Sequence, residues 1–164
     1  MMEQFKEEQR FTQWWMWALI SIAPFAILLI VYFASEEVRS NTTEWLLSVI
    51  GTCVLLPLVL FLSMRLDTKI TPEGIHYRFR PFHLRDRAIP WSQISKVYLR
   101  IYRPIAEYGG WGIKGGFGNG VAYNVKGNLG LQIELKSGKR ILIGTQRGSE
   151  IEKTLARWWI ANNN

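Results

Sequence analysis

Cysteine, histidine and aspartate are scarce in this chain of 164 residues. Cys53 is the only cysteine, which excludes a scaffold held together by disulfides. The two histidines, His76 and His83, lie among arginines, and neither Ser92 nor Ser95 has a histidine beside it, so no metal site or serine nucleophile is indicated. The sequence alone does not exclude a triad that folding assembles. We predict no catalytic residues, no metal and no cofactor, and we expect that the protein is not an enzyme.

Charge of either sign is missing from residues 11–35 and from residues 45–64. Residues 1–64 contain three Lys/Arg and six acidic residues, whereas residues 65–164 contain seventeen Lys/Arg and seven acidic residues. An apolar content of 48 % excludes a disordered chain. We therefore expect an apolar first part followed by a basic, folded second part.

The two uncharged stretches contain the apolar runs 14–34 and 45–64. At about 1.5 Å per helical residue, each run is long enough to cross the roughly 30 Å hydrocarbon core of a bilayer. Pro24 and Pro57 are tolerated in such helices, because a neighbouring helix can satisfy the freed carbonyl. Neither run contains an ionisable Asp, Glu, Lys, Arg or His, which argues against a pump or channel. We predict a transmembrane helical hairpin over residues 14–64.

The basic residues indicate an orientation for this hairpin. Lys6 and Arg10 precede the first run and several Lys/Arg follow the second, whereas the connector 35–44 contains only Arg39. The positive-inside rule then places both chain ends in the cytoplasm. We expect a multi-pass membrane protein with a cytoplasmic N-terminus, residues 1–13, and a cytoplasmic domain, residues 65–164.

After Met64 the apolar residues alternate with polar ones, which is typical of β-strands. The sequence 71–74, Thr-Pro-Glu-Gly, matches a type I turn. Pairing 70 with 75, 68 with 77 and 66 with 79 then places all six side chains on one face. The same register places Asp67 opposite Arg78 and Lys69 opposite His76. The pattern therefore predicts a β-hairpin.

Further strands are predicted at 95–103, 121–125, 129–135 and 140–144, the last two joined by a turn at 136–139. A C-terminal helix should follow, because Ile151, Leu155, Trp158 and Trp159 recur at helical spacing. We expect at least one of the two tryptophans to be buried against the sheets. The predicted fold class is an α+β membrane protein, in which the transmembrane hairpin precedes a β-barrel or sandwich closed by this helix.

Several motifs resemble those of a family of small bacterial membrane proteins of unknown function. They are Thr71-Pro72-Glu73-Gly74-Ile75, Ile89-Pro90-Trp91, Glu107-Tyr108-Gly109-Gly110-Trp111-Gly112-Ile113, Ala122-Tyr123-Asn124-Val125 and Ile143-Gly144-Thr145-Gln146-Arg147. In that family, two N-terminal transmembrane helices precede a domain like the bacterial pleckstrin-homology (PH-like) domain. The resemblance covers nearly the whole chain and implies that fold and a bacterial inner-membrane location. It implies no catalytic or binding residues.

Residues 109–120 read GGWGIKGGFGNG and are rich in glycine. The pattern Gly110-x-Gly112-x-x-Gly115 matches a dinucleotide fingerprint, but no βαβ unit surrounds it. The segment is then either a mobile loop between strands or a backbone surface for a partner strand or a headgroup. The candidate partner loop comprises Gly109, Gly110, Trp111, Gly112 and Phe117.

The run 76–87 mixes basic and aromatic residues, which is typical either of an anionic-lipid surface or of an exposed strand face. Lys69, Arg78 and Arg80 also match a loose phosphoinositide pattern. We expect weak, non-specific contact with anionic lipid headgroups and no nucleic-acid binding. The candidate contacts are Arg80, Arg85, Arg87, Lys96, Arg100 and Arg103.

Two functions remain open at this point. The first is a membrane-anchored, non-enzymatic PH-like scaffold that docks a protein or an anionic lipid at the cytoplasmic face. The alternative is a small accessory subunit of a transporter or secretion complex that assembles through its transmembrane helices. The direction in which Ser48, Gly51, Thr52 and Cys53 face would discriminate between them.

Overall fold

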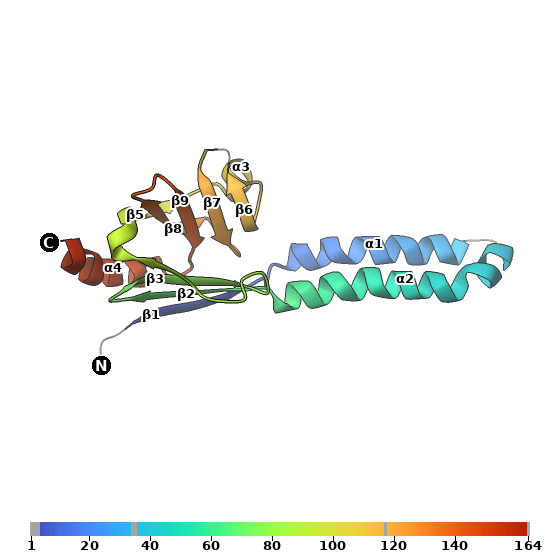
Figure 1. Ribbon diagram of the computed structural model, residues 1–164. Helices are drawn as coiled ribbons and strands as arrows, with labels where there is room; N and C mark the ends of the chain where they lie inside the picture. The colour runs from blue at the N-terminus through green and yellow to red at the C-terminus, as the bar shows by residue number, and fades with distance from the viewer. Residues whose placement is uncertain (1–3, 34–35, 117, 164) are drawn as a thin grey trace. The chain divides into compact units, whose positions relative to one another are not determined.

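The computed structural model describes residues 4–33, 36–116 and 118–163, which form two compact units (Figure 1). The helical unit comprises Thr12–Ser63 and holds helices α1 and α2. The two-sheet unit combines the chain up to Phe11 with the chain from Met64 onward, and it holds strands β1–β9. The chain therefore leaves the two-sheet unit after its first strand and returns to it for the second.

Helix α1 spans Trp14–Phe33 and helix α2 spans Glu36–Ser63, and the two helices contact each other. Hydroxyl groups bond within their own helix: Ser21 Oγ donates to the Trp17 carbonyl and Thr52 Oγ1 donates to the Ser48 carbonyl, both at 2.9 Å. Many large apolar side chains are exposed on both helices, among them Ile22, Phe25, Leu28, Ile30, Leu55, Leu56, Val59 and Leu62. Cys53 is exposed as well.

The predicted transmembrane hairpin is wrong. Within the described part of the chain, neither α1 nor α2 is both long enough and apolar enough to cross a membrane. The prediction rested on the length of the apolar runs 14–34 and 45–64 and on their lack of charge. Helix α2 in fact begins at Glu36, so most of the predicted connector 35–44 is helical and adds its charged residues to that helix. The predicted membrane fold class and the inner-membrane location, with both ends in the cytoplasm, are corrected with it.

The structure instead has an α+β fold with two β-sheets. Its elements after α2 are β2 (Arg65–Thr71), β3 (Gly74–Arg80), β4 (Arg87–Pro90), the 3-10 helix η1 (Trp91–Gln93), β5 (Ile94–Ile101), α3 (Pro104–Tyr108), β6 (Gly112–Gly116), β7 (Gly120–Asn124), β8 (Leu129–Leu135), β9 (Arg140–Gly144) and α4 (Gly148–Asn163). Strand β1 (Phe5–Arg10) precedes α1. The first sheet has the order β1-β2-β3-β4, and the second has the order β5-β8-β9-β7-β6.

The predicted hairpin of the first sheet is confirmed in its register. Ile70 pairs with Ile75, Thr68 with Tyr77 and Leu66 with Phe79, and all six side chains are buried. Asp67 lies opposite Arg78 and Lys69 lies opposite His76, on the outer face of the sheet. Strict alternation over both strands, with a turn between them, determines this pairing locally.

The second sheet contains the predicted β8–β9 hairpin, but its strand order was not foreseen. The glycine-rich segment forms an antiparallel hairpin, β6–β7, and this hairpin returns so that β7 lies parallel to β9. Asn124 at the end of β7 is fully buried; its Nδ2 donates to the Tyr102 hydroxyl at 2.8 Å, and its Oδ1 accepts from the Gly112 backbone N–H at 2.9 Å.

Strand β1 was missed by the sequence analysis, which treated residues 1–13 as a tail outside the domain. It pairs with β2 along its whole length, from Phe5 opposite Ile70 to Arg10 opposite Arg65. Its inward side chains bind the second sheet: Glu7 accepts from Thr145 Oγ1 at 2.6 Å and from the Gln146 backbone N–H at 2.8 Å. The folded domain therefore needs residues on both sides of the helical unit.

The predicted C-terminal helix is present as α4. Its Ile151 and Leu155 are buried, and the helix contacts β1, β2 and η1. The ring of Trp159 lies 5.8 Å from that of the buried Trp91, while Trp158 and Trp159 are both half-buried. The helix thus covers the first sheet, but the expectation that Trp158 or Trp159 is buried is wrong; the buried tryptophan of this contact is Trp91.

Candidate functional site: a basic groove

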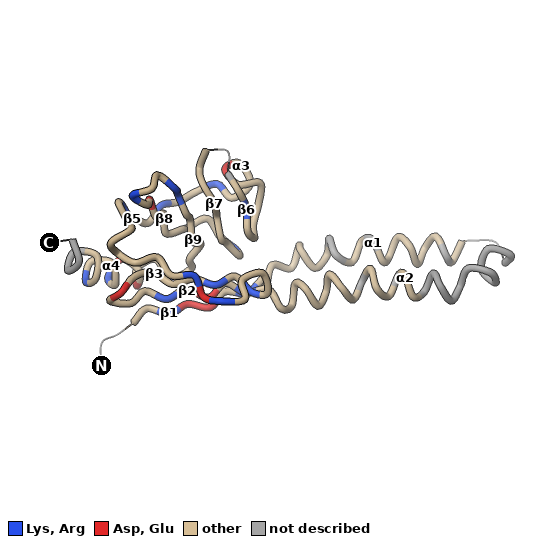
Figure 2. Tube along the Cα trace, in the orientation of Figure 1, with Lys and Arg blue, Asp and Glu red and all other residues tan. Residues whose placement is uncertain are grey.

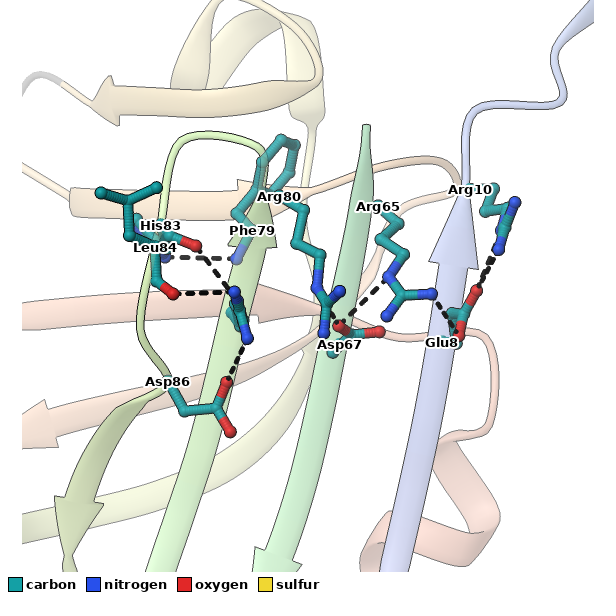
Figure 3. Close-up of polar contacts among 10 residues, drawn as sticks. Glu8, Arg10, Arg65, Asp67, Phe79, Arg80, His83, Leu84 and Asp86 are labelled. Atoms are coloured by element: carbon teal, nitrogen blue, oxygen red, sulfur yellow. Dashed lines mark hydrogen bonds and ion pairs between the residues drawn. The ribbon is translucent and has the colours of Figure 1, made fainter. Parts of the chain in front are cut away.

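The outer face of the first sheet carries the predicted phosphoinositide pattern, Lys69, Arg78 and Arg80, and both arginines of the pattern form ion pairs with acids. Asp67 forms ion pairs with Arg65 at 3.3 Å and with Arg80 at 3.2 Å, and Glu8 pairs with Arg65 and Arg10 (Figure 3). Figure 2 shows acidic and basic residues side by side along β1, β2 and β3. Three carboxylates, those of Glu8, Asp67 and Asp86, thus offset part of the positive charge of this face and reduce its attraction for an added anion.

Arg78 lies opposite Asp67 in the register, yet it bonds elsewhere. Its guanidinium donates to the backbone carbonyls of His83 at 3.1 Å and Leu84 at 2.7 Å, and it pairs with Asp86 at 3.4 Å. These contacts hold the loop 81–86 against β3. The loop itself exposes Phe82 and Leu84.

The six predicted basic contacts come from elements of both sheets and from the segments that flank them. Arg80 lies on β3, Arg85 in the loop before β4, Arg87 on β4, Lys96 and Arg100 on β5, and Arg103 before α3. Arg100 bonds Glu107 at 2.8 Å, and this hydrogen bond is the main reason that the pKa of Glu107 lies below its usual value. Lys96 lies over the Tyr98 ring at 5.0 Å. Of the six, only Arg87 enters the groove described next.

That groove lies between β3 and β4 of the first sheet and β7 and β9 of the second, and its volume is about 650 Å³. It is lined by Tyr77, Arg87, Gly118, Gly120, Val121, Tyr123, Gly138, Lys139, Arg140 and Ile141. Three of these residues are cationic: Arg87, Lys139 and Arg140. Among the described residues that line the groove, none is acidic. It therefore differs from the outer sheet face in having positive charge without a carboxylate in its wall.

Aromatic rings form the floor of the groove. The rings of Tyr77 and Tyr123 are 4.8 Å apart, and Arg87 Nη1 donates to the Tyr123 hydroxyl at 3.3 Å. Burial, reinforced by the neighbouring Tyr123, raises the pKa of Tyr77 to about 12. The Tyr77 phenol therefore keeps its proton at neutral pH and can act as a hydrogen-bond donor.

His83 lies behind this floor, 5.3 Å from the Tyr123 ring. Its Nδ1 accepts from the Phe79 backbone N–H at 3.2 Å, and the imidazole is buried. Burial, and then the charge of Arg87, lowers the pKa of His83, so a neutral ring is favoured at pH 7. His83 thus supports the groove without adding charge to it.

Two hairpin turns bring Gly118, Gly120 and Gly138 to the groove, each with a positive φ. A Cβ added at Gly120 would lie 2.0 Å from the Arg140 carbonyl oxygen. Glycine is required there, because β7 approaches the β9 backbone beside Arg140. This close approach sets the position from which Arg140 enters the groove.

The predicted partner loop, residues 109–117, is not one continuous loop, because it includes the end of α3 and strand β6. Gly109 ends α3 in a left-handed conformation, and Gly112 begins β6. Trp111 Nε1 donates to the Gly127 carbonyl at 3.1 Å. Phe117 lies outside the described residues. Gly109, Gly110, Trp111 and Gly112 are not among the described residues that line the groove.

Sequence reasoning missed Lys139 and Arg140, which it used only as the end of a turn and the start of a strand. The signal was present as a basic cluster around a glycine turn, Lys136-Ser137-Gly138-Lys139-Arg140. The pairing of β9 with β7 was needed to bring this cluster near Arg87. In the described part of the chain, no three His, Cys, Asp or Glu residues lie together as metal ligands, and the absence of a metal remains a prediction.

Comparison with protein-family models and with curated proteins finds no match to the chain. The resemblance to the bacterial PH-like family therefore stays a prediction. The groove must be interpreted from its own residues.

Proposed function

We propose that the two-sheet unit is a non-enzymatic binding module that holds an anionic group in the groove between its sheets. The observation that carries this proposal is the set of three cations, Arg87, Lys139 and Arg140, in a wall whose described residues include no acid. The alternative, an accessory subunit that assembles through its helices, is not tested by this groove: Ser48, Thr52 and Cys53 are exposed on α2, and no described helix could cross a membrane.

The groove has the chemistry that an anion needs. Guanidinium groups can bind phosphate or carboxylate through two parallel hydrogen bonds, and an ammonium adds a point charge. The Tyr77 phenol adds a neutral donor at the buried end. A volume of about 650 Å³ is within the range of small-molecule sites, so an anionic group could enter with part of the molecule that bears it. Free phosphate esters, lipid headgroups and phosphorylated proteins share this chemistry.

The test is a titration of the full chain with inorganic pyrophosphate at low salt, followed by calorimetry or by amide chemical shifts. Arg140→Gln should weaken binding about tenfold, which corresponds to about 1.4 kcal/mol. The matched control is Arg103→Gln, which removes the same charge from an exposed site outside the groove. It should change the affinity less than about twofold, because an exposed charge outside the site acts only through screened attraction.

Citrate provides a second arm, since it carries carboxylates in place of phosphates. Binding of pyrophosphate but not citrate would assign the groove to phosphoryl groups, and binding of both would assign it to anions in general. Equal losses in the Arg140 and Arg103 variants, or no binding of either anion at millimolar concentration, would overturn the proposal.

A further inference from the structure

The two sheets have four edge strands, and three of them carry features that discourage pairing with another strand. Strand β1 has exposed charged residues at alternate positions. Strand β4 has four residues and ends at Pro90. Strand β5 has an irregular register between Ile94 and Lys96, together with two cationic side chains. Short length, proline, bulges and charge are the usual protections of an edge.

Strand β6 is the fourth edge and is the least protected. It lies at the end of the second sheet (Figure 1) and reads Gly-Ile-Lys-Gly-Gly, with no proline and with an unbroken register against β7. Residues 113–115 are exposed. Lys114 is its single charged residue. An edge strand has N–H and C=O groups on its outer side that can pair with an extended peptide.

Gly115 is not explained by the fold. Its φ lies outside the left-handed region, and among the described residues a Cβ at this position would meet no atom within 4 Å. Neither backbone conformation nor packing within the chain therefore requires glycine, which weakens a strand relative to other residues. A glycine on an edge strand leaves room for an aromatic side chain of the neighbouring strand to lie across it.

The two faces of β6 differ in chemistry. Successive side chains of a strand point to opposite faces, so Lys114 lies on one face, whereas Ile113 and Gly115 share the other. A second copy of this strand is a poor partner, because symmetric pairing would bring two Lys114 side chains together and juxtapose two strongly basic units. An acidic strand would instead place opposite charge beside Lys114.

We propose that the β6 edge docks an extended segment of a partner protein in which acidic residues alternate with aromatic or aliphatic ones. The segment adds a strand to the second sheet. Its acidic face lies beside Lys114, and its apolar face lies over Ile113 and Gly115. This site is separate from the basic groove, because no residue from Gly112 to Gly116 lines the groove.

The probe is a synthetic peptide of alternating Glu and Tyr or Val, capped at both ends and titrated into the full chain. Amide chemical shifts should change first at residues 113–115. Lys114→Glu should weaken binding about tenfold. Lys136→Glu, an equal charge change in the exposed β8–β9 turn, is the matched control and should weaken it about twofold at most.

Two further arms separate strand addition from other modes of binding. A peptide with the same side chains but methylated backbone nitrogens should lose at least tenfold in affinity, because it cannot form the strand's hydrogen bonds. Arg140→Gln should leave peptide binding unchanged. Three results would each overturn the edge-docking proposal: equal binding of the methylated peptide, weaker binding in the Arg140→Gln variant but not in the Lys114→Glu variant, or no binding of the parent peptide. None of these results would decide the groove proposal, which has its own test.

Discussion

Leu56 on α2 and Leu66 on β2 are the same residue type, yet Leu56 is 68 % exposed and Leu66 is completely buried. The difference holds for the two units as a whole. In the helical unit, many described large apolar side chains are exposed on both helices, whereas in the two-sheet unit most of them are buried, with exceptions such as Leu84 and Ile101. Two helices can cover only the stripes along which they touch, but two sheets and a helix can enclose a core. Apolar composition therefore does not by itself say which residues are buried.

Polar side chains differ between the units in the same way. In the helices, Ser21 and Thr52 bond to carbonyls one turn earlier in their own helix. In the two-sheet unit, Glu7 bonds to Thr145 and Gln146, which lie near the other end of the chain. The hydroxyl bonds in the helices join residues one turn apart and connect no other element, whereas the bonds of Glu7 connect β1 to a distant part of its unit.

The largest expected effect comes from removing β1. Deleting residues 1–10 should abolish cooperative unfolding of the two-sheet unit, because the lost strand pairing, apolar burial and Glu7 bonds together approach the whole stability of a domain, about 5–15 kcal/mol. Replacing Thr12–Ser63 by an Asn-Gly turn should leave the unit folded, because Arg10 and Arg65 are already paired neighbours. Thermal melts followed by circular dichroism would compare the two. A deletion variant that melts like the full chain would contradict the assignment of β1.

A second comparison uses the same substitution in both units. Leu66→Ala should reduce the free energy of unfolding by about 2–5 kcal/mol, since it leaves a cavity in the core. Leu56→Ala should change it by no more than about 0.5 kcal/mol, because the side chain is exposed. Urea denaturation of the full-length variants measures both values, and similar losses in the two variants would show that the described exposure of α2 is wrong.

Glu7 and Glu8 are adjacent on β1, and they allow a direct comparison of a buried carboxylate with an exposed one. Glu7→Ala should cost about 2–3 kcal/mol, because the Thr145 hydroxyl and the Gln146 backbone N–H would lose their acceptors in a buried site. Glu8→Ala is the control: Glu8 faces outward and pairs with exposed arginines, and its removal should cost less than about 1 kcal/mol. Chemical denaturation should rank the two variants in this order. The reverse order would contradict the observed direction of β1.

The smallest effect concerns Tyr77 at alkaline pH. Its pKa is raised to about 12 by burial, against about 10 in an unfolded chain, so the unfolded state loses the phenolic proton first. Stability should therefore fall as the pH rises from 10 toward 12, and by pH 11 this one group should account for about 1.4 kcal/mol. Tyr77→Phe should remove that part of the slope. The difference in pH dependence between the parent protein and the Tyr77→Phe variant should persist when Thr12–Ser63 is replaced by a turn. If the pH dependence disappears with the helices, it does not come from Tyr77.

The sequence alone determined the β2–β3 register and the helix α4. Alternation with a period of two, or apolar spacing near 3.6, is a local property that any flanking structure must respect. Leu66, Ile75 and Phe79 could therefore be assigned to one buried face before the structure was known, and Ile151 and Leu155 to another.

Only the tertiary structure decided the membership of β1, the burial of Glu7 and the grouping of Arg87 with Lys139 and Arg140. Each depends on the pairing of segments far apart in the chain, which a local pattern does not contain. The start of α2 was also not contained in the local pattern: the helix begins at Glu36, inside the predicted connector, and not at the uncharged run from Trp45. Whether a cation attracts a ligand also depends on neighbours: the carboxylate of Asp67 forms an ion pair with Arg80, whereas Arg140, whose cross-strand neighbour on β8 is Glu134, lines a groove that has no acid among its described lining residues. Which cations have an acid beside them depends on distances between residues of different strands, and only the folded chain defines these distances.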